Sequence, residues 1–434
     1  MTSASLGQAP QSFGLRAATL LVVANMIGTG VFTTLGLQAE GVQDGAALLL
    51  LWLLGGLVAA CGALVYAELA AALPRSGGEY IYLSRSFGLS LGLIAGWVSA
   101  TVGFAAPVAL AAMAFAQYAA TVLPVAPTPT AVVAVIAIAA LHAFDVRLGT
   151  RFQVLMTLLK VVAVLFFCAA GLLLPAAPDA LVPLPNADTA AAVLSPAFAL
   201  SLVYVSYAYS GWNAATYVAA EVRSPQRLVP RALLLGTALV TLMYLLLNWV
   251  FLRSVPLEAL AGTVEVGALS ARWLFGEGGG RLMSAMLALL LLSTMSAMLL
   301  AGPRVFEAMA VDCPAMGLFG ARNRRGAPTR AVLFSLALAL GLIVTGTFAA
   351  VLAFAGFTLM LSSLLTVLGA LRLRRTEPML PRPFRIPWYP WPPLIYLCLT
   401  TAALLVVAWS SPLPVVLGLS ALGAWWWWLE RRPG

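Results

Sequence analysis

Two short stretches of small and polar residues interrupt apolar segments, and their residue types suit the binding of a charged ligand. The first is Ala24-Asn25-Met26-Ile27-Gly28-Thr29-Gly30-Val31-Phe32, inside an apolar segment at 17–38. Glycine costs about 1 kcal/mol relative to alanine within a helix, and it permits backbone angles that unwind the helix. In a bilayer, the freed N–H and C=O groups persist only where they line a cavity or meet a partner. Such a break therefore presents N–H groups to an anion and carbonyls to a cation.

The second stretch is Ser206-Tyr207-Ala208-Tyr209-Ser210-Gly211-Trp212-Asn213, inside the apolar segment 194–221. Small residues at such spacing also let two membrane helices pack closely, which is the alternative explanation for either stretch alone. Matched interruptions in corresponding helices instead indicate a transporter's binding site. A ligand that carries an anionic and a cationic group at one end, as an amino acid does, would suit both breaks.

The third feature that could take part in binding is the side chain of Lys160, which carries a positive charge. It is the only lysine beside twenty-three arginines, and it lies nine residues after Arg151, which is roughly 13 Å along a helix. Its stem can instead reach back to the aqueous interface. No carboxylate accompanies it at comparable depth, and none lies near either break, so we expect its ammonium to bond to the unpaired backbone near Gly28 to Gly30.

The elements that must position these residues are membrane helices. The 434 residues are 62% hydrophobic and 9% charged, with a mean hydropathy of +0.98, whereas soluble domains are about 25% charged. An all-α polytopic membrane protein follows. Twelve apolar segments approach or exceed the length that crosses a core of about 30 Å, and they are 17–38, 46–71, 88–122, 129–144, 150–174, 194–221, 231–252, 281–310, 329–346, 349–373, 389–410 and 412–429.

The arginines orient these segments. With a cytoplasmic N-terminus, twenty arginines fall at inner positions, and the outer positions hold Arg253, Arg272 and Arg281. This bias predicts that both termini are cytoplasmic and that the protein spans the cell's inner (plasma) membrane many times. The net charge of +9 is then an orientation signal, and no nucleic-acid partner is expected. The first sixteen residues lack a charged region and a cleavage site, so we expect the first span to be retained.

The order of the segments suggests an internal repeat. Five spans at 17–174 and five at 194–373 place the two breaks in helices that enter the membrane from opposite sides, as in an inverted repeat. Two additional helices at 389–429 follow, and the tails are 1–16 and 430–434. At the inner ends of helices, Glu68 is expected either to pair with an inner-loop arginine or to be an ordinary interfacial carboxylate. The proline and the paired glycines of Pro74-Arg75-Ser76-Gly77-Gly78-Glu79-Tyr80 predict a turn in the inner loop that follows. Arg304 and Glu307 have the spacing of a pair on one helix face.

Three parts of the sequence together resemble the amino acid, polyamine and organocation superfamily, most closely its L-type amino acid transporter branch and bacterial relatives. They are Met26-Ile27-Gly28-Thr29-Gly30-Val31-Phe32, Tyr66-Ala67-Glu68-Leu69 with Ser76-Gly77-Gly78-Glu79-Tyr80, and Tyr209-Ser210-Gly211-Trp212-Asn213 with Glu221 and Pro225. The resemblance implies the five-plus-five inverted repeat with broken helices one and six, two extra helices, and alternating access by a rocking bundle.

The resemblance also implies site roles. The substrate carboxylate would meet N–H groups around Gly28, Thr29 and Gly30. The amino group would meet the carbonyl of Met26 or Ile27 and those of Tyr207, Ala208 and Ser210. Gly211 would belong to the same substrate-binding segment. Tyr207 would close over the substrate from the outer side as a gate. Lys160 would occupy the place that a sodium ion takes in sodium-dependent relatives.

The sequence differs from the L-type branch at two places, and these differences bear on the expected partner and on the size of the pocket. The animal transporters join a heavy-chain glycoprotein through a cysteine between spans three and four, but the turn at 123–129 has none. A disulfide-linked heavy chain is therefore not expected. Ser210 stands where glycine is common, which narrows the pocket.

The function expected is sodium-independent transport of neutral L-amino acids, by exchange or uptake. The alternatives are a cationic amino acid or polyamine carrier, which needs a carboxylate for the second positive charge, and a membrane sensor that binds amino acids without moving them. An enzyme is not expected, because no nucleophile, metal cluster or acid pair recurs at membrane depth. No cofactor or metal is expected, and His142 lacks acidic or cysteine neighbours at ligand spacing. The sequence does not indicate an oligomeric state.

Overall fold

The structure is a computed structural model, and it describes residues 13–144, 146–176 and 184–410. The described residues form helices joined by turns, with no strand beyond a single parallel bridge between Phe13 and Val222. The α-helices are α1 Leu15–Met26, α2 Gly30–Gly41, α3 Gly45–Ala72, α4 Glu79–Phe87, α5 Leu89–Val98, α6 Ala106–Ala120, α7 Pro127–Phe144, α8 Val146–Leu173, α9 Thr189–Val193, α10 Pro196–Ala208, α11 Pro225–Ser254, α12 Leu257–Leu260, α13 Val266–Asp312, α14 Thr329–Thr345, α15 Phe348–Thr376 and α16 Trp391–Ser410. The π-helix η1 Ser99–Ala105 and the 3₁₀ helices η2 Ala214–Glu221 and η3 Pro314–Phe319 complete the list.

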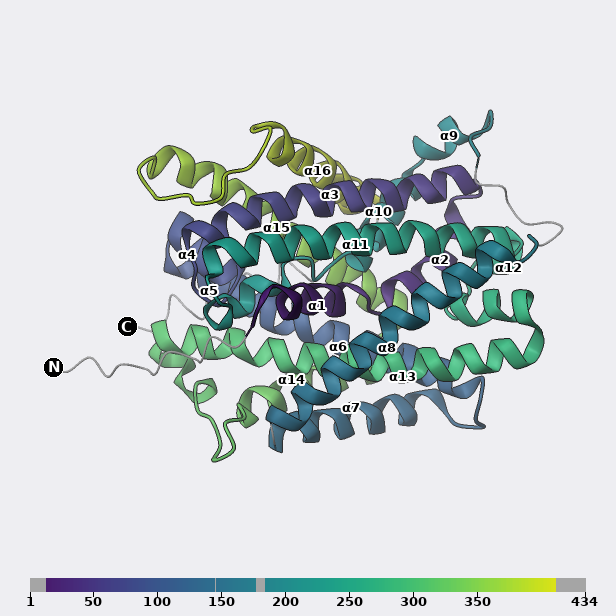
Figure 1. Ribbon diagram of the computed structural model, residues 1–434, viewed down its shortest axis with the longest axis horizontal. Helices are drawn as coiled ribbons and strands as arrows, with labels where there is room; N and C mark the ends of the chain where they lie inside the picture. Colours follow the sequence, from purple (N-terminus) through teal and green to yellow (C-terminus); the bar gives the residue numbers. More distant parts are fainter. Residues whose placement is uncertain (1–12, 145, 177–183, 411–434) are drawn as a thin grey trace.

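Eight helical segments are long and apolar enough to cross a membrane, and three shorter apolar helices accompany them among the described residues. These eleven coincide with the first eleven predicted spans. The twelfth predicted span, 412–429, and the two terminal tails lie largely outside the described residues. The chain is an all-helical, polytopic membrane protein. Figure 1 shows that most long helices run along one direction, with α3 beside α11 and with the short α1 and α2 between α11 and α13.

The first helix is broken where the glycines predict. Helix α1 ends at Met26 and α2 begins at Gly30. The turn between them is held by Gly28 N donating to Met26 O at 2.8 Å and by Phe32 N donating to Thr29 O at 3.0 Å. The first N–H groups of α2 and the last carbonyls of α1 therefore lie close together in the interior of the bundle.

The second break is confirmed as well. Helix α10 ends at Ala208, and the chain resumes as the 3₁₀ helix η2 at Ala214. Between them Gly211 has a φ of +97°, a conformation that side chains strongly disfavour. A Cβ atom added there would lie 2.8 Å from the carbonyl oxygen of Asn25. The backbones of the two breaks are thus in direct contact, and glycine is what allows it.

The segment expected as an inner turn at 74–80 differs from the prediction, because helix α4 begins within it at Glu79. Gly88, with φ +104°, reverses the chain so that α4 packs antiparallel to α5. Gly92 contacts Ser84, and Gly96 contacts Tyr80, so small residues on α5 let the two helices approach. This hairpin carries the start of α4 back into the bundle.

The depth of Glu79 follows from that hairpin. Its carboxylate lies beside Ser99, ten residues after α5 begins, which is about 15 Å along the helix axis. At Ser99 the helix widens into the π-helix η1, which ends at Ala105, two residues before Pro107. Proline removes a backbone donor and crowds the preceding turn, which explains the irregular segment at this position.

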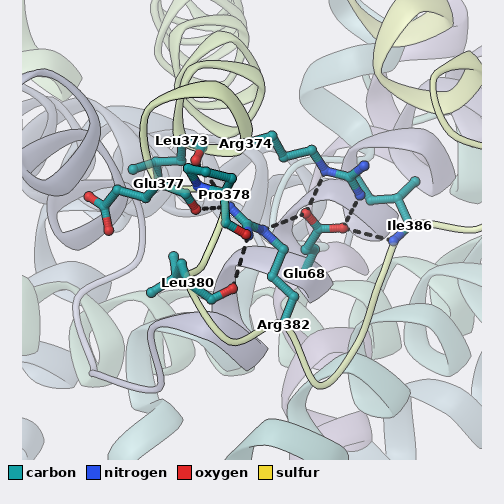
Figure 2. A network of polar contacts seen from close by, with 8 residues as sticks. All are labelled: Glu68, Leu373, Arg374, Glu377, Pro378, Leu380, Arg382 and Ile386. Atoms are coloured by element: carbon teal, nitrogen blue, oxygen red, sulfur yellow. Dashed lines mark hydrogen bonds and ion pairs between the residues drawn. The ribbon is translucent and has the colours of Figure 1, made fainter.

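Glu68 anchors the arginine-rich end of the bundle (Figure 2). Its carboxylate accepts two bonds from Arg374 of α15, one of them at 2.7 Å from Nε, and lies 3.4 Å from Nε of Arg382. The backbone N–H of Ile386 donates to it at 2.8 Å. The predicted pairing of Glu68 with an arginine is confirmed, and two arginines, Arg374 and Arg382, compensate the charge of this buried carboxylate.

The predicted pair of Arg304 with Glu307 is wrong. Arg304 lies 3.2 Å from Glu221 at the end of η2, and Glu307 accepts bonds of 2.5 and 2.8 Å from Arg322. The hydrogen bond to Glu307 raises the pKa of the Arg322 guanidinium. Helix spacing permits a local pair, but both side chains pair with residues of other elements. These ion pairs connect α13 to η2, through Glu221, and to the loop after η3, through Arg322.

Candidate functional site

Lys160 lies buried at the first break, with 1% of its surface exposed. Its Nζ donates to the carbonyl oxygen of Ile27 at 2.6 Å and to Oγ1 of Thr294 at 3.0 Å. The ammonium therefore does not reach the interface. The backbone bond expected near Gly28 to Gly30 is made to Ile27, the residue just before them. Together, the two bonds of the ammonium join α8 to α13 and to the end of α1.

A second polar side chain, Tyr244 of α11, spans both breaks. Its hydroxyl lies 2.5 Å from the carbonyl oxygen of Met26 and 3.0 Å from that of Ala208. A phenol has one proton, so it can donate fully to only one of these carbonyls at a time. The sequence prediction missed Tyr244, because a single tyrosine in an apolar span carries no pattern that marks it.

The glycines of the first break pack closely against neighbouring elements. A Cβ atom added to Gly30 would lie 2.6 Å from Cβ of Ala208, and one added to Gly28 would lie 3.4 Å from Cγ2 of Thr294. Oγ1 of Thr33 donates to the carbonyl oxygen of Thr29 at 2.9 Å. Gly30 thus has the close helix contact that was the alternative explanation, in addition to its place at the break.

An internal cavity lies beside the second break and extends across the bundle, with about 70 Å³ open to water-sized molecules, enough for several waters. Of the predicted binding residues, Tyr207, Ser210 and Gly211 line it, together with Asn25 from the first break. The remaining predicted binding residues do not line this cavity, namely Met26, Ile27, Gly28, Thr29, Gly30 and Ala208.

Tyr207, the predicted gate, is 5% exposed. Its ring belongs to a small apolar cluster of residues from α6 and α15, which includes Leu110 and Leu352. The ring covers one side of the cavity between α10 and α15.

Glu79 corrects the expectation that no carboxylate lies near a break. Its side chain lines the same cavity and is 3% exposed. Oε1 accepts from Nδ2 of Asn213 at 2.5 Å and from the Tyr66 hydroxyl at 3.0 Å. Oε2 accepts from the Tyr217 hydroxyl and, at 3.5 Å, from Ser99. The prediction failed because the α4 hairpin places this residue inside the protein rather than in an aqueous loop.

The only histidine has a structural environment. His142 is buried, and its Nε2 lies 2.7 Å from Oγ of Ser296, which joins α7 to α13. Within the described part of the chain, no three His, Cys, Asp or Glu side chains are grouped to hold a metal ion. The four cysteines, Cys61, Cys168, Cys313 and Cys398, are all unpaired.

Comparison with known proteins gives the family. Residues 13–428 match the model of the amino acid permease family. The rabbit large neutral amino acids transporter small subunit 2 is 27% identical over 422 residues, covering 95% of this chain and 78% of that protein. The serine/threonine exchanger SteT of Bacillus subtilis strain 168 is 25% identical over 440 residues, covering 97% and 98% of the two chains.

A third relative, the mouse Asc-type amino acid transporter 1, is 27% identical over 424 residues and covers 95% of this chain and 79% of its own length. The family match extends over both helix breaks, Lys160, Tyr244 and the α4 hairpin. This chain belongs to the amino acid permease family.

Proposed function

We propose that the protein carries neutral L-amino acids across the membrane without sodium, by alternating access, as an exchanger or in net uptake. The observation that carries the proposal is the meeting of two interrupted helices at one buried cavity, with Lys160 at the first break. The family supports transport, and the three relatives described above are named as transporters or exchangers of amino acids.

The substrate's main-chain groups would be recognised by backbone. N–H groups around Gly28, Thr29 and Gly30 would hold the carboxylate, because the start of α2 offers helix N-terminal donors and a favourable dipole. The N–H of Gly28 would exchange its present bond to the carbonyl oxygen of Met26 for one to the carboxylate. Carbonyls near the ends of α1 and α10 would hold the amino group. Several of them already accept one bond, from Lys160 or Tyr244, but each carbonyl has a second lone pair.

Lys160 would replace a sodium ion. A sodium ion in such a site would be held by carbonyl and hydroxyl oxygens, and Nζ of Lys160 contacts one of each, Ile27 O and Thr294 Oγ1. The positive charge is thus attached covalently to the protein, so no ion needs to bind from solution. Transport would then be insensitive to sodium.

Movement would follow the inverted repeat, with 17–174 and 194–373 as the two halves, 389–429 as additional helices, and short tails at 1–16 and 430–434. Both ends of the chain would be cytoplasmic in the cell's inner membrane, in keeping with the arginine distribution. Opening toward the cytoplasm would break contacts that join the inner ends of helices. These include the bond of Phe13 N to Glu221 O at 3.1 Å and the pair of Arg75 with Asp312 at 2.6 Å.

No disulfide-linked partner would be needed, since the turn at 123–129 lacks the cysteine that such a link requires. The lipid bilayer and the amino acid are the partners proposed. The test is counterflow with purified protein in liposomes, using labelled neutral amino acids with and without sodium and a proton gradient. Saturable exchange in sodium-free buffer is expected. Binding without exchange would instead support the sensor alternative, and a strict sodium requirement would contradict the role of Lys160.

A further inference from the structure

Two carboxylates are buried within the bundle to a similar degree, and their surroundings differ. Glu68 is 4% exposed and is faced by Arg374 and Arg382. Glu79 is 3% exposed, yet none of the ion pairs among the described residues includes it. A buried anion is normally paired with a cation or lies on the path of a charged ligand.

The four groups that contact Glu79 are neutral donors. They satisfy the carboxylate oxygens as hydrogen-bond acceptors, but they leave its charge uncompensated. Three of these bonds are 3.0 Å or shorter, whereas the bond from Ser99 is 3.5 Å long. The side of Oε2 toward Ser99 is therefore the weakest point of the shell, where an incoming donor has least to displace.

The carboxylate is also placed where a substrate can reach it. Glu79 lines the cavity, and its partner Asn213 lies two residues beyond Gly211 of the second break. Ser362 of α15 also lines this cavity; it is 8% exposed, and its Oγ has no hydrogen-bond partner. A buried hydroxyl without a partner is costly, and it can accept a bond from a cationic group that enters the cavity.

We propose that Glu79 forms a second subsite, which binds a side-chain ammonium group of the substrate. The inference rests on the proposed function, because the α-amino and α-carboxylate groups occupy the helix breaks while the side chain extends toward Glu79. The transporter accordingly accepts diamino acids, such as 2,4-diaminobutyrate, in addition to neutral amino acids.

The experiment compares 2,4-diaminobutyrate with norvaline, which has a methyl group in place of the distal amine. Liposomes that contain the purified protein are loaded with unlabelled alanine, and the uptake of each labelled compound is measured. The wild type is expected to exchange both. Glu79→Gln keeps the shape of the side chain and removes its charge, and the hydroxyls of Tyr217 and Ser99 can turn to accept from the new amide NH2 group. It should therefore raise KM for diaminobutyrate about tenfold or more while changing KM for norvaline less than about threefold. Glu258→Gln, which changes an exposed carboxylate of α12, is the control and should change neither.

Two outcomes overturn the subsite. Equal losses of both substrates in Glu79→Gln would make Glu79 a structural tie, and wild-type exchange of norvaline without any competition from diaminobutyrate would show that no ammonium binds there. Exchange of diaminobutyrate without exchange of norvaline would support the subsite and contradict the proposed neutral function. If Glu79→Gln does not fold, Glu79→Asp provides the second variant, and a shift of preference toward ornithine, whose chain is one methylene longer, is then expected.

Discussion

Nζ of Lys160 and the carbonyl oxygen of Ile27 are 2.6 Å apart, across 133 residues of sequence. This bond fixes the end of α1 to α8 at the point where the first helix is interrupted. Because the ammonium also reaches Thr294 of α13, one side chain joins three helices that alternating access would move relative to one another.

Replacing Lys160 tests that connection. Lys160→Ala removes the charge-assisted bonds, each worth about 1.5–3 kcal/mol, so exchange should fall at least tenfold. Lys160→Arg should fail nearly as badly, because the planar guanidinium does not fit a site built for a compact ammonium. Uptake in sodium-free and sodium-containing buffer measures both effects. Full activity of Lys160→Ala without sodium would remove the proposed role.

Tyr244→Phe removes one hydroxyl and leaves the ring in place. The carbonyls of Met26 and Ala208 then lose their shared donor, at a cost of about 1–3 kcal/mol for a buried acceptor. We expect a lower melting temperature and a several-fold higher KM for neutral amino acids. Tyr118→Phe is the control, since it also removes a buried hydroxyl that donates to a carbonyl, that of Phe32, but at a site away from the cavity. Identical KM changes in the two variants would argue against a specific role.

Substitutions of Ser210 and Gly30 distinguish a role in substrate binding from a role in helix packing. Ser210 lines the cavity, so Ser210→Trp should abolish uptake while the protein remains folded, and Ser210→Gly should retain uptake. Gly30 contacts Ala208, with no room for a methyl group, so Gly30→Val should lower stability as well as uptake. Size-exclusion profiles and melting curves distinguish the two outcomes. Normal uptake by a folded Ser210→Trp protein would place the substrate elsewhere.

Glu68→Ala tests the network at the arginine-rich end. It leaves Arg374 and Arg382 without their shared carboxylate, and removing one partner of a buried pair costs about 3–5 kcal/mol. The melting temperature in detergent should fall by several degrees, while the KM of the protein that remains folded should be unchanged. An unchanged melting temperature would mean that solvent already screens the pair. Glu258→Gln is again the control, because that carboxylate is exposed.

Lys160, Glu79 and Arg304 show which features of the site and the fold can be predicted from the sequence and which cannot. The breaks were predicted because glycine clusters have a local backbone meaning, and Lys160 because its residue type is unique in the chain. Glu79 was assigned to an aqueous loop, since its depth depends on how Gly92 and Gly96 of α5 let α4 fold back. Arg304 was paired with Glu307 by helix spacing, whereas contacts from distant elements decided its partner. A contact between distant segments could be predicted where an unusual charged residue needed a partner, as for Lys160, whereas the packing that buries Glu79 and selects the partner of Arg304 could not.

The hydroxyl of Tyr244 has a final consequence. Its single proton faces two carbonyl oxygens. The hydroxyl oxygen lies 2.5 Å from the carbonyl oxygen of Met26 and 3.0 Å from that of Ala208, so the bond to Met26 is the stronger one. The hydroxyl therefore donates mainly to Met26, and the carbonyl of Ala208 at the end of α10 keeps the longer and weaker contact. Under the proposed function, the substrate's ammonium group would donate to the Ala208 carbonyl. The free energy of an under-satisfied buried acceptor, about 1–3 kcal/mol, would then become part of the affinity for any ligand that carries an amine.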